Sequence, residues 1–362
     1  MGEGSAFQPK HNYTIDNDPK LSHFDPRPEL VVSETLIARP RFPVVDAHNH
    51  LGSEFGGGWS GRDVSELLDV LDAAGVRCVV DLDGGWGEDI LDDHLKRFKA
   101  VHPDRFICFG GIDWSRWPEE GSSFPELAAA RFKAQVGRGA QGLKIWKDLG
   151  LTVRDHLGNR VAIDDPRLDE LWNAAAELRV PVTIHTADPV AFFRPHDHRN
   201  ERYLVLSKHP EWHFGRSGYP SHQQLLGEMT SLIKRHSRTV FIGAHVGCYA
   251  ENLKWVSDLL DACPNFYVDL GARYDELGRQ PYTARAFLIK YSSRVLYGAD
   301  HPPGVDMYRL TYRFLETKDE NFVGPNGDRP GASWRIHGVY LPEEVLRLIY
   351  FENASRLFSV GW

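Results

Sequence analysis

Short apolar runs alternate with amphipathic stretches along the chain from Pro43 onward. The apolar runs predict eight strands, at Val44–Ala47, Cys78–Leu82, Phe106–Phe109, Gly142–Trp146, Val182–Ile184, Val240–Ala244, Tyr267–Leu270 and Val295–Tyr297. Helical spacing of apolar residues predicts helices between them, among them Ser65–Ala74, Asp89–Val101, Phe124–Val136 and Asp165–Leu178. Short strands without polar alternation are typical of a parallel sheet that is buried on both faces. Eight such strands separated by helices predict an α/β fold of the TIM (β/α)8 barrel class.

Three segments depart from this regular alternation. Residues 1–40 are polar and contain prolines without periodicity, so we expect an extended N-terminal arm followed by one barrel domain over residues 41–362. About fifty residues, Pro189–Arg238, separate the fifth and sixth strands, which is too many for a loop and one helix. The stretch Pro302–Tyr340 after the eighth strand is similarly long. Both are expected to be long insertions, which either cover the active site or serve the surface structure alone.

Composition and charge narrow the classes of function. The chain has 362 residues, of which 42% are hydrophobic, enough for the large core of one barrel. A net charge of −8 without a basic face argues against nucleic acid and anionic lipid as partners. We find no signal-peptide pattern and no apolar run long enough to span a membrane. The four cysteines lack CxxC spacing, so we expect buried thiols in a reducing cytoplasm.

Residues that bind metals or move protons end four of the predicted strands. The first strand ends in His48 and His50, the fifth in His185, the sixth in His245 and the eighth in Asp300. Barrel active sites lie at the C-terminal strand ends, so these side chains are expected to converge. One such histidine alone is more often a core or surface residue, and it is the joint placement that indicates a site.

The chemistry of this set is that of a metal-dependent enzyme. His48 and His50 are two residues apart and therefore point the same way, so both can reach one ion. With His185 and Asp300 they form a site of three histidines and one aspartate that leaves room for water. Asp300 can also hold the proton released when that water ionises. His245 is either a ligand of a second ion or a general acid and base. His196-Asp197-His198 is discounted as a ligand pair because it lies in a polar loop without a preceding strand.

Longer segments around these residues resemble the amidohydrolase superfamily, especially its amidohydrolase-related branch. That branch contains hydrolases, lactonases and decarboxylases of the aminocarboxymuconate-semialdehyde type. The similarity covers residues 44–358, and the segments that carry it are VVDAHNHLG (44–52), GLKIW (142–146), VPVTIHTADP (180–189), TVFIGAHVG (239–247), VLYGADHPP (295–303) and LPEEVLRLIYFENASRLF (341–358).

The resemblance implies a role for each strand-end residue. It implies that the ligands of a single divalent ion are His48, His50, His185 and Asp300, and that His245 is the catalytic histidine beside them. Zinc is the first choice, with manganese, iron or cobalt as alternatives. In binuclear members a lysine at the end of the fourth strand is carboxylated and bridges two ions. Lys144 stands at that position, so a second ion is possible; otherwise Lys144 pairs with a carboxylate or a substrate anion.

Three functions follow from the resemblance and the residues. The first is hydrolysis of a small amide, lactone or other ester by a metal-activated water, with His245 and Asp300 as catalytic residues. The second is non-oxidative decarboxylation (a lyase reaction) of an aromatic or unsaturated acid by the same metal site. Several aromatic decarboxylases of the branch have Glu-x-His in place of His-x-His, so the His48–His50 pair favours hydrolysis. The third is a metal-binding barrel protein without catalysis.

The substrate is expected to be a small molecule, and a carboxylate fits the available cations. Arg194, Arg202 and Arg273 are candidates to bind an anionic group, and Trp146 is a candidate wall of the pocket. Packing or a surface ion pair explains each of them equally well. A homo-oligomer is also possible, because the branch often dimerises.

Overall fold

The computed structural model describes residues 20–23, 26–52, 57–327 and 334–359. The chain divides into two compact units, residues 1–31 and 32–362, which are treated separately. In the first unit the described part contains one 3-10 turn, Leu21–His23. Residues 1–19 of the predicted arm lie outside the described residues. Everything that follows concerns the second unit.

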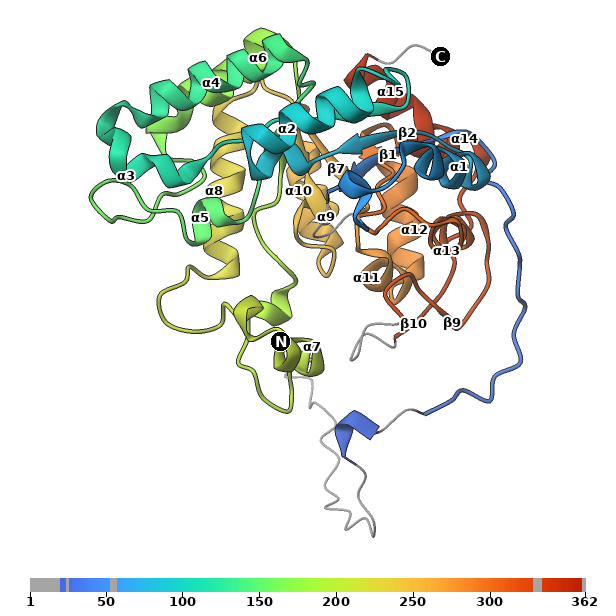
Figure 1. Ribbon diagram of the computed structural model, residues 1–362. Helices are drawn as coiled ribbons and strands as arrows, with labels where there is room; N and C mark the ends of the chain where they lie inside the picture. Colours follow the sequence, from blue (N-terminus) through green and yellow to red (C-terminus); the bar gives the residue numbers. More distant parts are fainter. Residues whose placement is uncertain (1–19, 24–25, 53–56, 328–333, 360–362) are drawn as a thin grey trace. The chain divides into compact units, whose positions relative to one another are not determined.

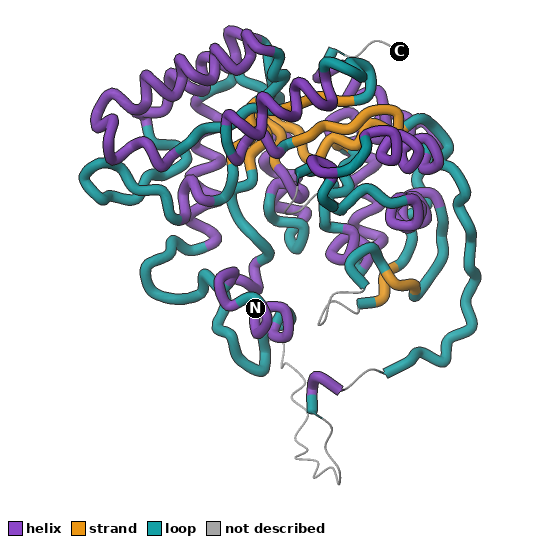
Figure 2. Tube along the Cα trace, in the orientation of Figure 1, coloured by secondary structure: helices purple, strands orange, loops and turns teal. Residues whose placement is uncertain are grey.

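Eight short parallel strands form the centre of the second unit (Figures 1 and 2). They are β1 Val44–Asn49, β2 Val76–Asp81, β3 Phe106–Cys108, β4 Leu143–Ile145, β5 Val182–Ile184, β6 Phe241–Gly243, β7 Phe266–Asp269 and β8 Val295–Leu296. The first three pair in the order β1-β2-β3, and the other five in the order β4-β5-β6-β7-β8. The strand order follows the chain order, as it does in a barrel.

Backbone hydrogen bonds join the two sheets at both seams. Between β3 and β4, Gly110 N–H donates to the carbonyl of Gly142 at 2.9 Å and Lys144 N–H to the carbonyl of Gly110 at 2.8 Å. Between β8 and β1, Ala47 N–H donates to the carbonyl of Tyr297 at 2.9 Å. The sheet is therefore closed, and the predicted TIM barrel is confirmed.

Helices lie outside the strands and pack their apolar faces inward (Figure 1). The longer ones are α1 Val64–Ala74, α4 Phe124–Arg138, α6 Asp169–Leu178, α8 His222–Arg235, α10 Leu253–Ala262, α12 Pro281–Lys290 and α13 Val305–Glu316. The sequence marks their ends. Asp63 caps α1 by accepting from Ser65 N–H, and Gly75 ends it in the left-handed conformation, with φ 75°. The predicted helix over residues 89–101 is less regular, because α2 (Glu88–His94) runs into a π-helical turn, Leu95–Lys99.

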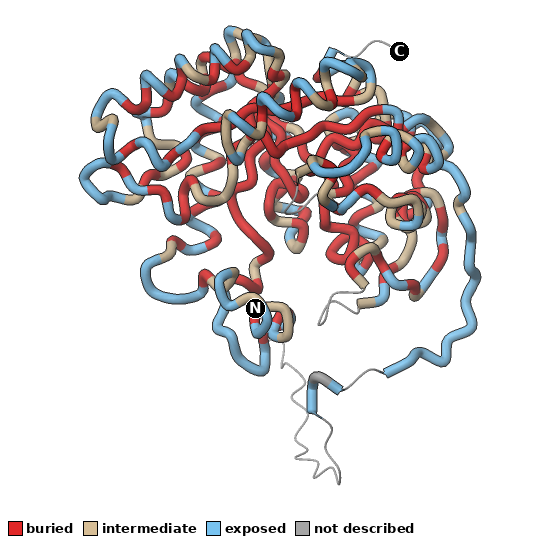
Figure 3. The backbone as a smooth tube through the Cα atoms, in the orientation of Figure 1, coloured by how far each residue is buried: buried red, intermediate tan, exposed pale blue. Residues whose placement is uncertain are grey.

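Burial follows the layers of the barrel (Figure 3). The strands are almost entirely buried, and exposed positions lie on the outer faces of the helices. One continuous apolar cluster packs the strands against the helices. Large apolar side chains fill it, because burial of apolar area supplies most of the folding free energy. This packing fixes the strand ends, and with them any side chain that leaves a strand at its C-terminal end.

The stretches after β5 and β8 carry additional short elements. The first contains a 3-10 turn, Val190–Phe193, the helix α7 Tyr203–Lys208 and a second turn, Pro210–Trp212. The second contains α13 and a two-stranded antiparallel pair, β9 Phe322–Val323 and β10 Arg335–Ile336. Short helices close the chain, α14 Glu343–Arg347 and α15 Asn353–Phe358. Within the described part of the chain, no helix combines the length and apolar character needed to cross a membrane.

Candidate metal centre and pocket

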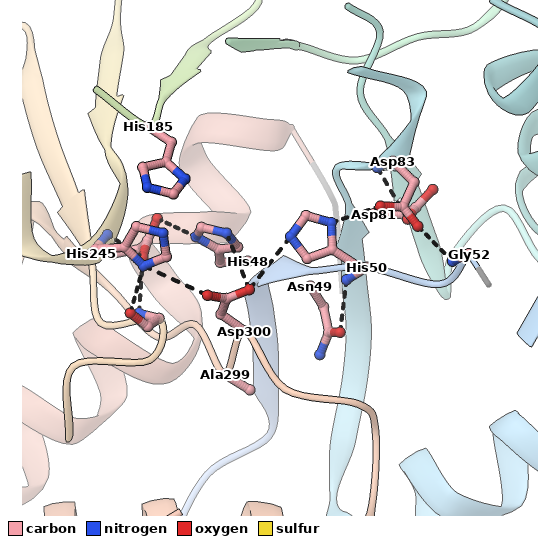
Figure 4. Close-up of polar contacts among 12 residues, drawn as sticks. His48, Asn49, His50, Gly52, Asp81, Asp83, His185, His245, Ala299 and Asp300 are labelled. Carbon is pink, nitrogen blue, oxygen red and sulfur yellow. Dashed lines mark hydrogen bonds and ion pairs between the residues drawn. The ribbon is translucent and has the colours of Figure 1, made fainter. Parts of the chain in front are cut away.

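The end of β1 and the loop after β8 bring three of the predicted ligands together. His48 and His50 leave the end of β1 two residues apart, and Asp300 N–H donates to the carbonyl of His48 at 2.8 Å across the seam. Asp300 Oδ1 lies 3.6 Å from His48 Nε2 and 3.4 Å from His50 Nε2. Figure 4 shows both imidazoles directed at this carboxylate. One donor atom from each residue falls within 4.8 Å of the others, so the three side chains can share one ion.

Two buried carboxylates hold the imidazoles in this orientation. His48 Nδ1 donates to Asp269 Oδ2 at 2.9 Å, and His50 Nδ1 donates to Asp83 Oδ1 at 2.7 Å. Each imidazole therefore leaves Nε2 for the space beside Asp300, the arrangement by which carboxylates orient histidine ligands. Neither carboxylate was predicted from the sequence as part of the site. The signal was present, because Asp269 ends β7 and Asp83 follows β2.

A third carboxylate ties the two ligand segments to each other. Asp46, fully buried in β1, accepts from Ala299 N–H at 2.9 Å, and Ala299 directly precedes Asp300. It also accepts from Tyr308 Oη of α13 at 2.9 Å. Burial raises the pKa of Asp46 to about 6, although these donors act against that rise. The spacing between the ends of β1 and β8 is thus fixed by hydrogen bonds beneath the cluster.

His185 lies apart from this cluster. Its Nε2 lies 3.2 Å from Asp188 Oδ1, and Lys147 Nζ donates to Asp188 Oδ2 at 2.6 Å. Burial lowers the pKa of His185 to about 4, so the ring is neutral at pH 7. Among the residues that the structure describes, no group of three close donors includes His185. Figure 4 shows it beside His245, and their ring centroids are 4.4 Å apart.

His245 stands between His185 and Asp300. Its Nδ1 donates to the carbonyl of Gly271 at 2.8 Å and lies 3.7 Å from Asp300 Oδ2. Burial holds the pKa of His245 well below its ordinary value, so the imidazole is neutral. A neutral ring whose Nδ1 carries the proton has its lone pair on Nε2. His245 can therefore accept a proton at that atom.

The backbone around these residues is strained. His245, Val246 and Asp300 have φ values of 58°, 59° and 52°, in the left-handed region that side chains other than glycine rarely adopt. Gly271 packs closely against the same residues: a Cβ there would lie 3.0 Å from Asp300 Cβ and 3.1 Å from His48 Nδ1, so a larger residue would have to displace its neighbours. Strain of this kind persists where the surrounding packing enforces it, and it gathers at functional sites.

Lys144 carries a buried amine. Its Nζ has no hydrogen-bond partner among the described residues and lies 4.6 Å from the centroid of the Trp146 ring. Burial lowers the pKa of Lys144 to about 8. Trp146 in turn stacks on His50, with ring centroids 5.1 Å apart. Lys144 therefore lies at the edge of the cluster, and a substantial part of it is neutral near pH 8.

A pocket of about 370 Å³ opens beside the cluster. His185, His245 and Asp300 line it together with residues of the stretch after β5, and Pro302 and Asn326 come from the stretch after β8. Two aromatic rings of the first stretch, Phe192 and Trp212, also line it. Both long stretches thus contribute walls to the same pocket.

The predicted substrate contacts divide into two groups. Arg202 and Arg273 are buried and line the pocket. Arg202 pairs with Glu276. Arg194 is exposed and lines a different surface depression, and Trp146 contacts His50 without lining the pocket. The structure therefore brings two of the three arginines to the pocket.

The family follows from comparison with known sequences. The chain matches the Amidohydrolase family over residues 45–360, and it belongs to that family. The match covers the whole barrel and all the strand-end residues described above. No curated protein matches the chain.

Solved structures with the same fold include several decarboxylases. The 2,6-dihydroxybenzoate decarboxylase from Rhizobium is 16% identical, with a TM-score of 0.56, over 88% of this chain and 99% of that one. The 5-carboxyvanillate decarboxylase from Novosphingobium aromaticivorans, complexed with manganese and 4-hydroxy-3-methoxy-5-nitrobenzoic acid, is 13% identical, with a TM-score of 0.52, over 90% and 100%. A dihydroxybenzoic acid decarboxylase from Polaromonas, with manganese and 2-nitroresorcinol, is 14% identical, with a TM-score of 0.57, over 88% and 98%. Likeness at these identities establishes the fold and leaves the reaction open.

Proposed function

We propose that the chain is a metal-dependent hydrolase of a small organic molecule, an amide, a lactone or another ester. One observation carries the proposal: His48, His50 and Asp300 offer three donors to one point, and His245 stands beside them in the pocket with a free Nε2. This arrangement supports a cation site, a proton acceptor and substrate space beside one pocket. A cation site, a proton acceptor and substrate space together are typical of an enzyme active site.

The donor set fits a divalent ion. Two neutral imidazole nitrogens and a carboxylate oxygen suit zinc, and also manganese, iron or cobalt. His48, His50 and Asp300 would hold the ion, and His185 could join as a fourth ligand through Nδ1, the ring nitrogen that Asp188 does not contact. When bound, such an ion polarises a substrate oxygen and lowers the pKa of water.

The protein's own groups would then handle the proton. His245, neutral and fixed through Gly271, accepts a proton from the attacking water at Nε2 and returns it to the leaving oxygen or nitrogen. Asp300, whose pKa the neighbouring histidines hold well below its ordinary value despite burial, stays ionised through this exchange.

Decarboxylation is the second candidate, and the pocket gives it a specific argument. Arg273 and the aromatic pair Phe192 and Trp212 line the space beside the cluster, which suits an aromatic or unsaturated acid. In that reaction the bond from the ring carbon to the carboxyl carbon breaks, carbon dioxide leaves, and a proton takes its place on carbon. The similar solved structures named above are decarboxylases, which adds weak support.

The proposed function can use one metal ion or two. The unpartnered amine of Lys144 can react with carbon dioxide to form a carbamate, and a carboxylated Lys144 with His185 and His245 would supply a second ion site. We propose one ion, because His185 is engaged by Asp188 rather than by a donor group around Lys144.

We also propose a cytoplasmic location, because all four cysteines are unpaired, buried thiols.

Isotope labelling tests the two reactions side by side. The protein is loaded with zinc or manganese and offered aryl esters, lactones and amides in one set and aromatic acids in the other. Hydrolysis places one heavy oxygen atom from labelled water in the acid product, whereas decarboxylation releases labelled carbon dioxide from a labelled carboxyl group. Labelled acid from the wild type, lost in His245→Asn, supports the proposal; labelled carbon dioxide instead supports decarboxylation. Metal-loaded protein that does neither points to a metal-binding barrel without catalysis.

A further inference from the structure

Arg273 stands close to the candidate metal centre and is held there by the loop after β7. Gly271, two residues earlier, accepts from His245 Nδ1, and Ala272 N–H donates to the carbonyl of Ala299 at 3.1 Å. Arg273 is 9% exposed and lines the same pocket as His245 and Asp300. The loop that positions the catalytic candidates therefore also positions this guanidinium.

Of the other lysines and arginines that line the pocket, Lys147 and Arg202 have carboxylate partners and Lys208 is exposed, whereas Arg273 is buried without a carboxylate partner among the described residues. Lys147 pairs with Asp188 at 2.6 Å, and Arg202 pairs with Glu276. Within the described ranges no carboxylate lies within 4.0 Å of the Arg273 guanidinium, and its one hydrogen bond runs from Nη1 to the carbonyl of Ala272 at 3.1 Å. A guanidinium has five N–H donors in a planar fork, so most of its binding capacity is left for a ligand.

The wall of the pocket is aromatic. Phe192 and Trp212 lie nearly parallel, with ring centroids 6.0 Å apart and an interplanar angle of 20°. His209 stacks on the Trp212 ring at 3.9 Å and 10°. All three line the pocket with Arg273. Flat apolar surface of this kind favours a planar ligand.

We propose that Arg273 binds an anionic group of the substrate other than the group that reacts at the metal centre. The substrate is then a planar, aromatic or conjugated molecule with two polar ends. One end is the ester, amide or carboxylate that reacts, and the other is a carboxylate that stays intact. The inference rests on the proposed function for its description of the reacting end, and it applies to hydrolysis and decarboxylation alike.

Binding of two matched probes tests this assignment. Isophthalate carries two carboxylates on one ring, and 3-carbamoylbenzoate replaces one of them by a neutral amide of the same shape. Affinities are measured by calorimetry on manganese-loaded protein. We expect isophthalate to bind wild type at least about tenfold more tightly, because a charge-assisted bidentate contact is lost with the amide. Arg273→Gln should remove this preference and leave the affinity for 3-carbamoylbenzoate within about twofold.

Two further variants keep the test decisive. Arg199→Gln makes the same substitution at an exposed arginine that does not line this pocket, and it should keep the full preference. Arg273→Lys retains the charge without the planar guanidinium, so it should keep part of the preference for isophthalate. If Arg273→Gln does not fold, this variant tests whether Arg273 binds the second carboxylate.

The outcomes separate this inference from the proposed function. An unchanged preference in Arg273→Gln, or equal binding of both probes by wild type, overturns the assignment. Arg273 would then only balance the charges of Glu276, Glu251 and Asp188, which outweigh burial and raise its pKa. Probe binding needs no turnover. A protein that prefers isophthalate through Arg273 but hydrolyses nothing would therefore refute the hydrolase and keep the anion site.

Discussion

The β1 side and the β5 side of the candidate site differ in which imidazole nitrogen contacts a carboxylate. On the β1 side, Asp269 and Asp83 bind the Nδ1 atoms of His48 and His50, and the Nε2 atoms face Asp300. On the β5 side, Asp188 instead binds Nε2 of His185. A carboxylate on one ring nitrogen orients an imidazole so that the other nitrogen can bind a metal, which is Nε2 in His48 and His50 and Nδ1 in His185.

This difference assigns separate tasks to the two sides. Hydrogen bonds beneath the cluster fix the donors of the β1 and β8 side, so under the proposed function this side is ready for an ion before any ligand arrives. The β5 side faces the pocket and joins His185 to the walls that hold a substrate. We therefore expect changes on the first side to act mainly on metal affinity, and changes around the pocket to act mainly on catalysis or substrate binding.

The largest effect is expected for His50→Ala. Removing a donor from the prearranged side should lower metal affinity by more than the roughly 10- to 100-fold typical of outer partners, and activity should vanish with the metal. Metal content and thermal unfolding are measured together. His198→Ala, at an exposed histidine of the polar loop, should keep both metal and activity. Full activity in a folded His50→Ala protein would refute the site.

His245→Asn should separate catalysis from metal binding. The variant loses the proton acceptor in the pocket, so kcat should fall by about 100- to 10,000-fold. Its metal content should stay near that of wild type, since His245 is not one of the three clustered donors on the β1 and β8 side. Elemental analysis checks the second point, and a halved metal content would instead indicate two ions.

The pair Asp269→Asn and Asp188→Asn compares the sides directly. Asp269→Asn removes the charge behind His48 and should weaken metal binding by about 10- to 100-fold. Asp188→Asn should change it by less than about tenfold, because Asp188 holds a ring outside the cluster. Competition with a chelator measures both affinities. Equal losses would mean that His185 already belongs to the prearranged side.

Metal affinity should also rise with pH. Burial lowers the pKa of His50, but the hydrogen bonds and charges of Asp300 and Asp83 outweigh burial and raise it to about 9. Without an ion His50 is therefore protonated at neutral pH, and the ion must displace that proton. Affinity should increase by about tenfold per pH unit up to about pH 9. A flat profile in chelator competition from about pH 7 to pH 8 would contradict this account.

The smallest effect is expected for Arg194→Gln. The side chain is exposed and lines a separate depression, so KM should change by less than about twofold and the free energy of unfolding by less than about 0.5 kcal/mol. Steady-state kinetics and chemical denaturation measure both. A large rise in KM would mean that Arg194 contacts the substrate, and it would contradict the pocket described above.

Much of the fold could be predicted from the sequence, because strand periodicity is a local property. The fifth strand was predicted at its observed bounds, Val182–Ile184, and the other strands differ by a residue or two at their ends. The helix over residues 89–101 was less accurate. A π-helical turn at Leu95–Lys99 keeps the same apolar residues as an α-helix, so the pattern does not reveal it.

The candidate site was predictable only where chemistry and strand ends coincide. His48, His50 and Asp300 were found that way, and they converge because parallel strands end at one face of the barrel. Asp269 was not predicted, since an acidic residue in an apolar run does not reveal which histidine it binds. The position of Arg194 relative to the pocket depends on how the long stretch after β5 folds back, which no local pattern encodes.

Metal content per chain is the measurement that tests the central claim most directly. It is determined by elemental analysis on protein purified without added metal or chelator. About one zinc or manganese ion per chain is the predicted result, held by His48, His50 and Asp300. About two ions would point to a carboxylated Lys144 and a second site. Protein that contains no divalent ion and takes up neither zinc nor manganese when they are offered would contradict the account.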